Sequence, residues 1–165
     1  MMTPFVVALE KIHDVKSFNC GNDVLNNWLG SIARQHQDNS LSQTFVLVDA
    51  DFPQVVLGYY ALALRSMTPK EALPREIAKK LPRNLPGITL ARLGVQQGEQ
   101  GKHYGEYLLV DAMRRARAAA LEVGGWSLFV DAKDDQAAGF YRKYGFIPLP
   151  SNPLVLFMSF ANMPE

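Results

Sequence analysis

The sequence has little of what several classes of protein require. Its single cysteine excludes an intramolecular disulfide, and three scattered histidines leave no zinc cluster, so we expect no metal. The 17 Lys+Arg residues nearly balance the 16 Asp+Glu residues, and a net charge of +1 is not typical of a strong RNA-binding protein. The longest apolar run, Val55–Leu64, is well short of the roughly 20 residues that span a bilayer.

What remains is typical of a folded α/β domain. Hydrophobic residues make up 48% and charged residues 20% of 165 residues, which suits one domain over residues 1–165. The residues Met1–Pro4 carry no basic side chain, and the apolar patch Phe5–Leu9 is too short for a signal peptide. We therefore expect a cytoplasmic protein that is not associated with a membrane.

Hydrophobic periodicity predicts a mixed sheet flanked by helices, because strands and helices alternate in the second half while the first half contains a hairpin. The predicted strands are Phe5–Ile12, Gln43–Asp49, Val55–Arg65, Ile88–Gln96, Ser127–Ala132, Phe146–Leu149 and Leu154–Phe160. The predicted helices are Asp23–His36, a short helix that starts at Pro74 and ends before Pro82, Gly105–Val123 and Asp134–Tyr144.

A glycine-containing loop, Gln97–Tyr104, joins a predicted strand to the longest predicted helix. Such a junction presents unpaired backbone N–H groups and the positive end of the helix dipole, so it predicts an anion site, although a plain turn has the same pattern. Gln96 and His103 stand where a Walker loop needs Gly and Ser/Thr, and the dinucleotide fingerprint is also absent.

Several ordered motifs resemble the GNAT N-acetyltransferase superfamily from about residue 8 to residue 160. The carboxyl-terminal motifs are the loop Gln100–Gly105, the strand end Asp131–Lys133 and the helix and strand that contain Phe140-Tyr141 and Gly145-Phe146. The opening, with Phe18–Gly21, Leu25-Asn26, Trp28-Leu29 and Thr44–Val46, resembles the GNAT toxins of bacterial toxin–antitoxin pairs, which acetylate aminoacyl-tRNA.

The resemblance implies a single-domain GNAT fold: a mixed, mostly antiparallel sheet with splayed strands at the acetyl-CoA site. It implies an acyltransferase that moves the acetyl group of acetyl-CoA to a primary amine, here the α-amine of aminoacyl-tRNA. The residues that it assigns to acetyl-CoA are Leu93, Gly94, Val95, Gln100, Gly101, Lys102, His103, Tyr104, Gly105, Ala137 and Phe140. His103 stands where the family's loop usually has a glycine. Its Cβ crowds the pyrophosphate of acetyl-CoA unless the histidine tolerates an unusual φ.

Tyr141 is the candidate general acid, and the resemblance carries this role. The residues alone favour a packing role instead, because Ala137, Phe140, Tyr141 and Tyr144 share one helical face. Asp134 and Asp135 are better explained as residues of the first helical turn, so we identify no general base. An aminoacyl ester lowers the basicity of its own α-amine, which makes a strong base unnecessary. For Cys20, which follows a turn, we expect a structural role.

Local charge gives the candidate RNA contacts. Lys79, Lys80 and Arg83 lie in a proline-punctuated segment, and Arg92 lies on a predicted strand among apolar residues, where it needs a partner or a cleft. The resemblance adds a small DNA-binding antitoxin and a homodimer. Two alternatives stay open: a GNAT enzyme that acetylates a small amine or a protein amino terminus, and a GNAT-like binding module without catalysis.

Overall fold

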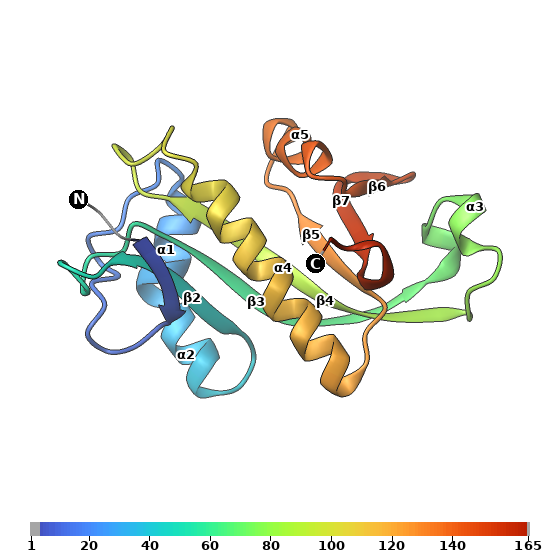
Figure 1. Cartoon of the computed structure of the whole chain (residues 1–165), viewed down its shortest axis with the longest axis horizontal. Coiled ribbons are helices and arrows are strands. Elements are labelled where there is room, and N and C mark those ends of the chain that lie inside the picture. The colour runs from blue at the N-terminus through green and yellow to red at the C-terminus, as the bar shows by residue number, and fades with distance from the viewer. Residues whose placement is uncertain (1–3, 165) are drawn as a thin grey trace. The chain divides into compact units, whose positions relative to one another are not determined.

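The computed structural model describes residues 4–164, so Met1–Thr3, included in the signal-peptide argument above, lie outside the described residues. Seven strands form one sheet in the order β1-β2-β3-β4-β5-β7-β6 (Figure 1). Pairs β1–β2, β2–β3, β5–β7 and β6–β7 are antiparallel, and β4–β5 is parallel. The strands are β1 Pro4–Ala8, β2 Gln43–Asp49, β3 Gly58–Pro69, β4 Asn84–Val95, β5 Ser127–Asp131, β6 Ile147–Leu149 and β7 Asn152–Ser159. The α-helices are α1 Asp23–Ser31, α2 Ala33–Asp38, α3 Arg75–Ala78, α4 Tyr104–Val123 and α5 Asp135–Lys143. The sheet is therefore mixed and mostly antiparallel, as the sequence predicts.

The chain folds into two compact units. The first unit contains the chain up to Ala63 together with Arg92–Ala112, and the second contains Leu64–Ala91 together with the chain from Met113 on. Strands β3 and β4 and helix α4 each contribute residues to both units.

In the first unit, helices cover both faces of the sheet. Neighbouring strand residues point to opposite faces, so each strand contributes side chains to both helical layers. Val46 and Val48 of β2 pack in one buried cluster with Trp28 and Leu29 of α1. On the other face, the hydroxyl of Tyr60 in β3 donates a 2.5 Å hydrogen bond to the carboxylate of Asp111 in α4. Tyr59, the neighbour of Tyr60, points into the α1 cluster and donates to Leu25 O at 2.8 Å.

The core of the second unit is aromatic. Phe129 of β5 and Phe157 of β7 are fully buried with ring centroids 6.0 Å apart, and Trp126 lies 5.6 Å from Phe157. Leu73 and Leu85 complete this cluster, against which the short helix α3 packs through Ile77 and Ala78. The helix begins directly after Pro74, as predicted.

Two predicted elements near the amino terminus are longer than the elements in the structure. The predicted helix Asp23–His36 is wrong as one element: it is interrupted at Ile32 (φ −121°, ψ −36°), which ends α1 and begins α2. Its start is confirmed, since the side chain of Asn22 caps α1 by accepting from Leu25 N at 3.0 Å. The predicted strand Phe5–Ile12 is too long, because β1 ends at Ala8 where its register with β2 ends.

Strands β3 and β4 run past the predicted boundaries, to Pro69 and back to Asn84 respectively. Lys70 N, just after β3, donates to Arg83 O, just before β4, at 2.9 Å. This long-range bond closes the proline-punctuated connection, and no local pattern in the sequence predicts it. Among the described residues, no helix combines the length and apolar character that crossing a membrane requires.

His13 makes the stability of the fold depend on pH. It is buried, and its Nδ1 accepts a 2.9 Å hydrogen bond from Glu10 N. Burial lowers the pKa of His13 below its ordinary value of about 6.5, so the unfolded chain binds this proton more readily than the folded one. The free energy of unfolding should therefore fall as the pH drops below about 6.5, by at most about 1.4 kcal/mol per pH unit. Urea unfolding between pH 7.5 and 5.0 measures this, and an equal slope in H13Q would contradict the assignment.

Candidate functional site

The junction between β4 and α4 belongs to the first unit and is held by the chain on either side of it. Gln96 N donates to Leu57 O at 2.9 Å, and Gln97 N donates to Asn19 O at 2.8 Å. Asn19 N in turn donates to Gln96 Oε1 at 2.9 Å. The start of the loop is therefore anchored to the segment that precedes α1.

Beyond this anchor the loop winds through left-handed backbone conformations. Gly98, Gly101 and His103 have φ values of 86°, 85° and 64°. In the described part of the chain, we find no acceptor for the amides of Gly101, Lys102 and His103, which precede the first turn of α4. A Cβ added at Gly101 would have no heavy atom within 4 Å. Unpaired amides in open space at a helix amino terminus are the kind of group that binds an anion, and the sequence predicts an anion site in this loop.

Two predicted cofactor residues in this loop use their side chains for other purposes. The side-chain amide of Gln100 donates to Val95 O at 3.1 Å and to Cys20 O at 3.3 Å, which holds the loop against β4. Lys102 Nζ lies 2.6 Å from Glu99 Oε2, so a neighbouring carboxylate already pairs its charge. The main chain, rather than these side chains, is what the loop offers to an anion.

His103 adopts the left-handed conformation that its place in the motif requires, and its side chain is 80% exposed. Its Nδ1 lies 3.3 Å from Glu106 Oε1, one turn into α4. The imidazole therefore points to solvent.

We predict that H103G changes acetyl-CoA affinity less than threefold. A left-handed φ costs a non-glycine residue about 1–2 kcal/mol, but glycine loses more conformational entropy on folding, so the free energy of unfolding should change by less than about 1 kcal/mol. Calorimetry with acetyl-CoA and thermal unfolding measure both quantities. A tenfold gain in affinity would show instead that the histidine crowds the anion site.

The end of β4 runs on beyond its parallel partner. The register of β4 with β5 ends at Leu90↔Val130, although β4 continues to Val95. Leu93, Gly94 and Val95 are therefore on a stretch without a β5 partner among the described residues, because β5 itself ends at Asp131. A Cβ at Gly94 would lie 3.2 Å from Cys20 Sγ. The buried Cys20 thus packs against β4, which supports its structural role.

Tyr141 belongs to the second unit, on α5. Asp134 caps this helix by accepting from Ala137 N at 2.8 Å, which confirms the predicted role of that aspartate. The Tyr141 side chain is 6% exposed, with Phe140 and Phe146 against its ring at 5.4 and 5.9 Å between centroids. We find no hydrogen bond from its hydroxyl to any described residue. Tyr141 is thus part of the core through its ring, while its hydroxyl is unused by the fold.

The surroundings of Tyr141 keep its phenol protonated. Burial, and secondarily the negative charge of Asp131, raises the pKa of Tyr141 well above its ordinary value. Asp131 Oδ1 lies 3.4 Å from an Arg65 nitrogen, which also donates to Thr89 Oγ1 at 3.1 Å. The Arg65 guanidinium stacks 4.7 Å from the centre of the Phe129 ring. Asp131 is therefore held beside the aromatic core of the second unit.

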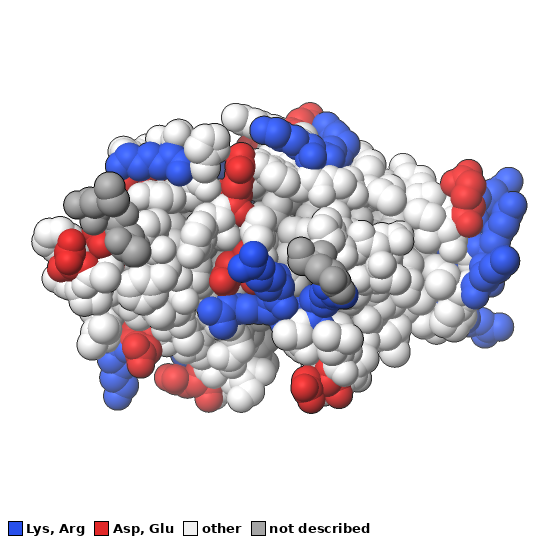
Figure 2. All heavy atoms as spheres, in the orientation of Figure 1, with Lys and Arg blue, Asp and Glu red and all other residues white. Residues whose placement is uncertain are grey.

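The predicted RNA contacts fall into two places. Lys79, Lys80 and Arg83 are exposed in the second unit, in the connection from α3 to β4, and Figure 2 shows basic side chains gathered over α3. Arg92 is in the first unit, where its guanidinium lies 4.9 Å from the centre of the Trp28 ring. The sequence predicts that Arg92 needs a partner, but not that the partner is an indole on α1.

These features are those expected of the GNAT class of acetyltransferases: a mixed sheet, a strand that continues past its parallel neighbour, and a loop with unpaired amides before the next helix. No family model matches the chain. It is 34% identical over 145 residues to the tRNA-acetylating toxin of Mycobacterium tuberculosis strain ATCC 25618 / H37Rv, which covers 88% of this chain and 85% of the relative. The chain belongs to the family of GNAT-type tRNA-acetylating toxins.

Solved structures agree with this assignment over nearly the whole chain. A Tyr-to-Phe mutant of KacT superposes with a TM-score of 0.89 at 31% identity, covering 96% of this chain and 95% of KacT. AtaT complexed with acetyl-methionyl-tRNAfMet gives 0.88 at 32% identity, covering 96% of both chains. Other neighbours are AtaTR bound with AcCoA (TM-score 0.81, 30% identity, 96% and 94% covered) and an AtaT mutant bound to the C-terminus of the antitoxin AtaR (0.79, 31%, 96% and 94%).

Proposed function

We propose that this protein transfers the acetyl group of acetyl-CoA to the α-amine of aminoacyl-tRNA and thereby blocks translation as a toxin. The observation that carries the proposal is the cradle of unpaired amides at Gly101, Lys102 and His103 before α4. Acetyl-CoA supplies the activated acyl group and carries a diphosphate, and main-chain amides at a helix start suit such an anion. The proposed acceptor, the α-amine of aminoacyl-tRNA, is inferred from the family to which the chain belongs.

Each segment of the site has its own proposed role in binding acetyl-CoA. The backbone of Leu93, Gly94 and Val95 pairs with the pantetheine arm, and the segment Gln100–Gly105 holds the diphosphate, with Tyr104 starting the helix. Ala137 and Phe140 on α5 line the path of the thioester. This assignment treats residues 1–165 as one acetyltransferase domain.

Tyr141 acts on the leaving group. The amine nitrogen attacks the thioester carbonyl and forms the C–N bond, the C–S bond breaks, and the sulfur keeps the electron pair of that bond. The surplus proton on the nitrogen passes to solvent water. A phenol of ordinary pKa near 10 is a weaker acid than a thiol near 8.5, and the raised pKa of Tyr141 widens that gap. Full proton transfer to the sulfur is then uphill by more than about 2 kcal/mol, so Tyr141 donates a hydrogen bond that strengthens as the thiolate develops.

We further propose that Lys79, Lys80, Arg83 and Arg92 contact the RNA and that the acceptor amine needs no enzyme base. Two other expectations rest on the family: a homodimer and a small DNA-binding antitoxin as partner, consistent with the AtaT–AtaR complex named above. A cytoplasmic location follows from a substrate that serves translation.

The test is the fate of labelled acetyl groups. Purified protein should move them from acetyl-CoA to charged tRNA but not to the same tRNA after the amino acid is hydrolysed off. Transfer to free amino acids or peptides with none to charged tRNA would overturn the proposed acceptor. Absence of acetyl-CoA binding in calorimetry would overturn the enzyme class.

A further inference from the structure

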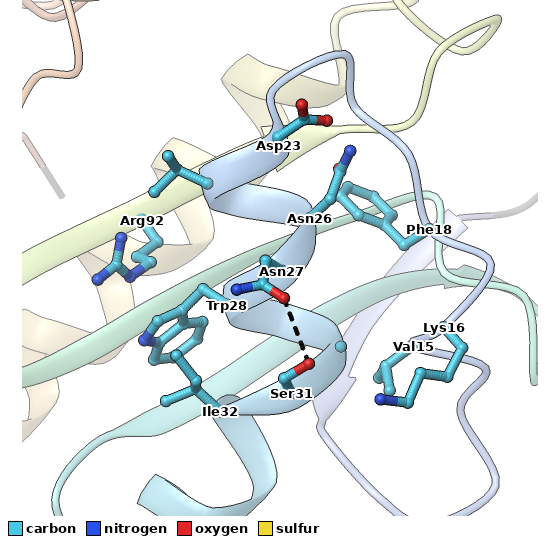
Figure 3. A pocket seen from close by; sticks show the side chains of 12 residues that line it. Val15, Lys16, Phe18, Asp23, Asn26, Asn27, Trp28, Ser31, Ile32 and Arg92 are labelled. Carbon is cyan, nitrogen blue, oxygen red and sulfur yellow. Dashed lines mark hydrogen bonds between the residues drawn. The ribbon is translucent and has the colours of Figure 1, made fainter.

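The roles proposed above provide partners for acetyl-CoA and for the RNA phosphates but none for the acceptor amine. Arg92, in the pocket of about 740 Å³ beside α1 (Figure 3), is among the cations assigned to the RNA. An amine needs a hydrogen-bond acceptor instead, and a carboxylate suits it best because the nitrogen becomes positively charged as it attacks the thioester. The carboxylate of Asp131, in the second unit, has no role in the mechanism above.

Asp131 is the last residue of β5, and Arg65 of β3 holds its carboxylate in place. One nitrogen of Arg65 lies 3.4 Å from Asp131 Oδ1 and also donates to Thr89 Oγ1 of β4 at 3.1 Å. The same guanidinium lies 4.7 Å from the centre of the Phe129 ring. Phe129 and Asp131 are two residues apart on one strand, so their side chains point to the same face of the sheet. Arg65 therefore reaches both side chains and fixes the carboxylate on that face.

The ion pair leaves half of this carboxylate available to a ligand. Arg65 contacts Oδ1, and no residue among 4–164 donates a hydrogen bond to Asp131 Oδ2. The Asp131 side chain is 45% exposed, whereas that of Arg65 is 22% exposed. A carboxylate that is held through one oxygen can accept an N–H at the other oxygen without losing its orientation.

Asp131 also acts electrostatically on Tyr141, which belongs to the same unit. Burial, and after it the negative charge of Asp131, raises the pKa of Tyr141 above its ordinary value. In the mechanism above, Tyr141 donates to the sulfur of the thioester, and the amine attacks the carbon bonded to that sulfur. The second unit thus contains a donor for the sulfur and, within electrostatic reach of it, an acceptor for the amine.

We propose that Asp131 Oδ2 accepts a hydrogen bond from the α-amine of the aminoacyl ester and stabilises the positive charge that the nitrogen gains as the C–N bond forms. The inference rests on the proposed function in taking charged tRNA as the substrate. Asp131 orients the amine and takes no proton, since the surplus proton passes to solvent water. A site built to accept from an amine discriminates against a ligand that lacks it, so tRNA carrying an α-hydroxy acid should bind less tightly.

The first test measures binding in the absence of acetyl-CoA, so that no transfer can occur. Fluorescence anisotropy compares bulk charged tRNA with the same tRNA after nitrous acid has converted its α-amines to hydroxyls, and deacylated tRNA treated in the same way corrects for damage to the bases. The wild-type protein should prefer the amine form about three- to tenfold, as one hydrogen bond allows. D131N should lose this preference, and D135N, which removes an exposed carboxylate from the first turn of α5, should keep it.

The second test is steady-state transfer to charged tRNA. D131N should lower kcat about tenfold or more, because an amide cannot stabilise the cationic nitrogen, with acetyl-CoA affinity within a factor of two. The sign separates this contact from an effect through Tyr141. Loss of the Asp131 charge would by itself lower the pKa of Tyr141 and make its phenol a stronger donor, which would raise kcat. D135N should have the kcat of the wild type.

Two results would overturn the inference: D131N keeping the wild-type preference for the amine form, or D131N turning over as fast as D135N. If D131N fails a thermal unfolding check, D131S takes its place in both assays. The outcome is separable from the proposed function. A wild-type protein that prefers the amine form through Asp131 but transfers no acetyl group would reject the function alone. Normal transfer by the wild type, with D131N equal to D135N in both assays, would reject this inference alone.

Discussion

Replacing Tyr141 by Phe should reduce kcat for acetyl transfer about 100-fold or more while leaving acetyl-CoA affinity within a factor of two. The substitution removes only the hydroxyl, to which we find no described residue hydrogen-bonded, so the packing against Phe140 and Phe146 survives. A preorganised hydrogen-bond donor aimed at developing negative charge contributes about 10²–10³-fold to a rate. Steady-state kinetics with charged tRNA and calorimetry with acetyl-CoA separate the two effects.

The matched control is Y144F, one turn further along the chain from Tyr141, whose ring packs 5.2 Å from Phe140. It should retain nearly full activity. Because the pKa of Tyr141 is raised, the wild-type rate should also show no loss attributable to tyrosine ionisation below about pH 10. Y141F turning over as fast as Y144F would remove Tyr141 from the mechanism and leave it a core residue.

The second large effect concerns the basic side chains after α3. The triple variant K79Q/K80Q/R83Q should raise KM for charged tRNA roughly 10- to 100-fold and flatten its dependence on salt, because fewer phosphate contacts release fewer counterions. All three residues are exposed, so the fold should tolerate the change. KM measured at several KCl concentrations gives both quantities.

R114Q, which removes an exposed guanidinium from α4, serves as the control and should leave KM unchanged. An R114Q effect as large as that of the triple variant would place the RNA on α4 instead. A triple variant with the salt dependence of the wild type would show that Lys79, Lys80 and Arg83 are simply solvated.

The sequence predicts those parts of the molecule that local patterns determine. Asn22 and Asp134 cap α1 and α5 because short polar side chains accept from the first turn wherever a helix begins. The loop before α4 is predicted for a similar reason, since its unpaired amides follow from the strand–loop–helix order itself.

The unpredicted features depend on residues far apart in the chain. The side-chain amide of Gln100 binds Cys20 O, and Arg92 stacks on Trp28, contacts that arise only when β4 lies beside α1. The break at Ile32 was missed because apolar residues keep helical spacing across it. A charged residue in an apolar strand indicated that Arg92 needed a partner, but no signal in the sequence identified the indole.

Mass spectrometry of nucleosides from bulk charged tRNA, after incubation with the protein and acetyl-CoA, tests the central claim most directly. We predict acetylated aminoacyl-adenosine from the wild-type protein and almost none from Y141F. Unmodified aminoacyl-adenosine throughout, with a wild-type protein that is folded and binds acetyl-CoA, would contradict the proposed acceptor.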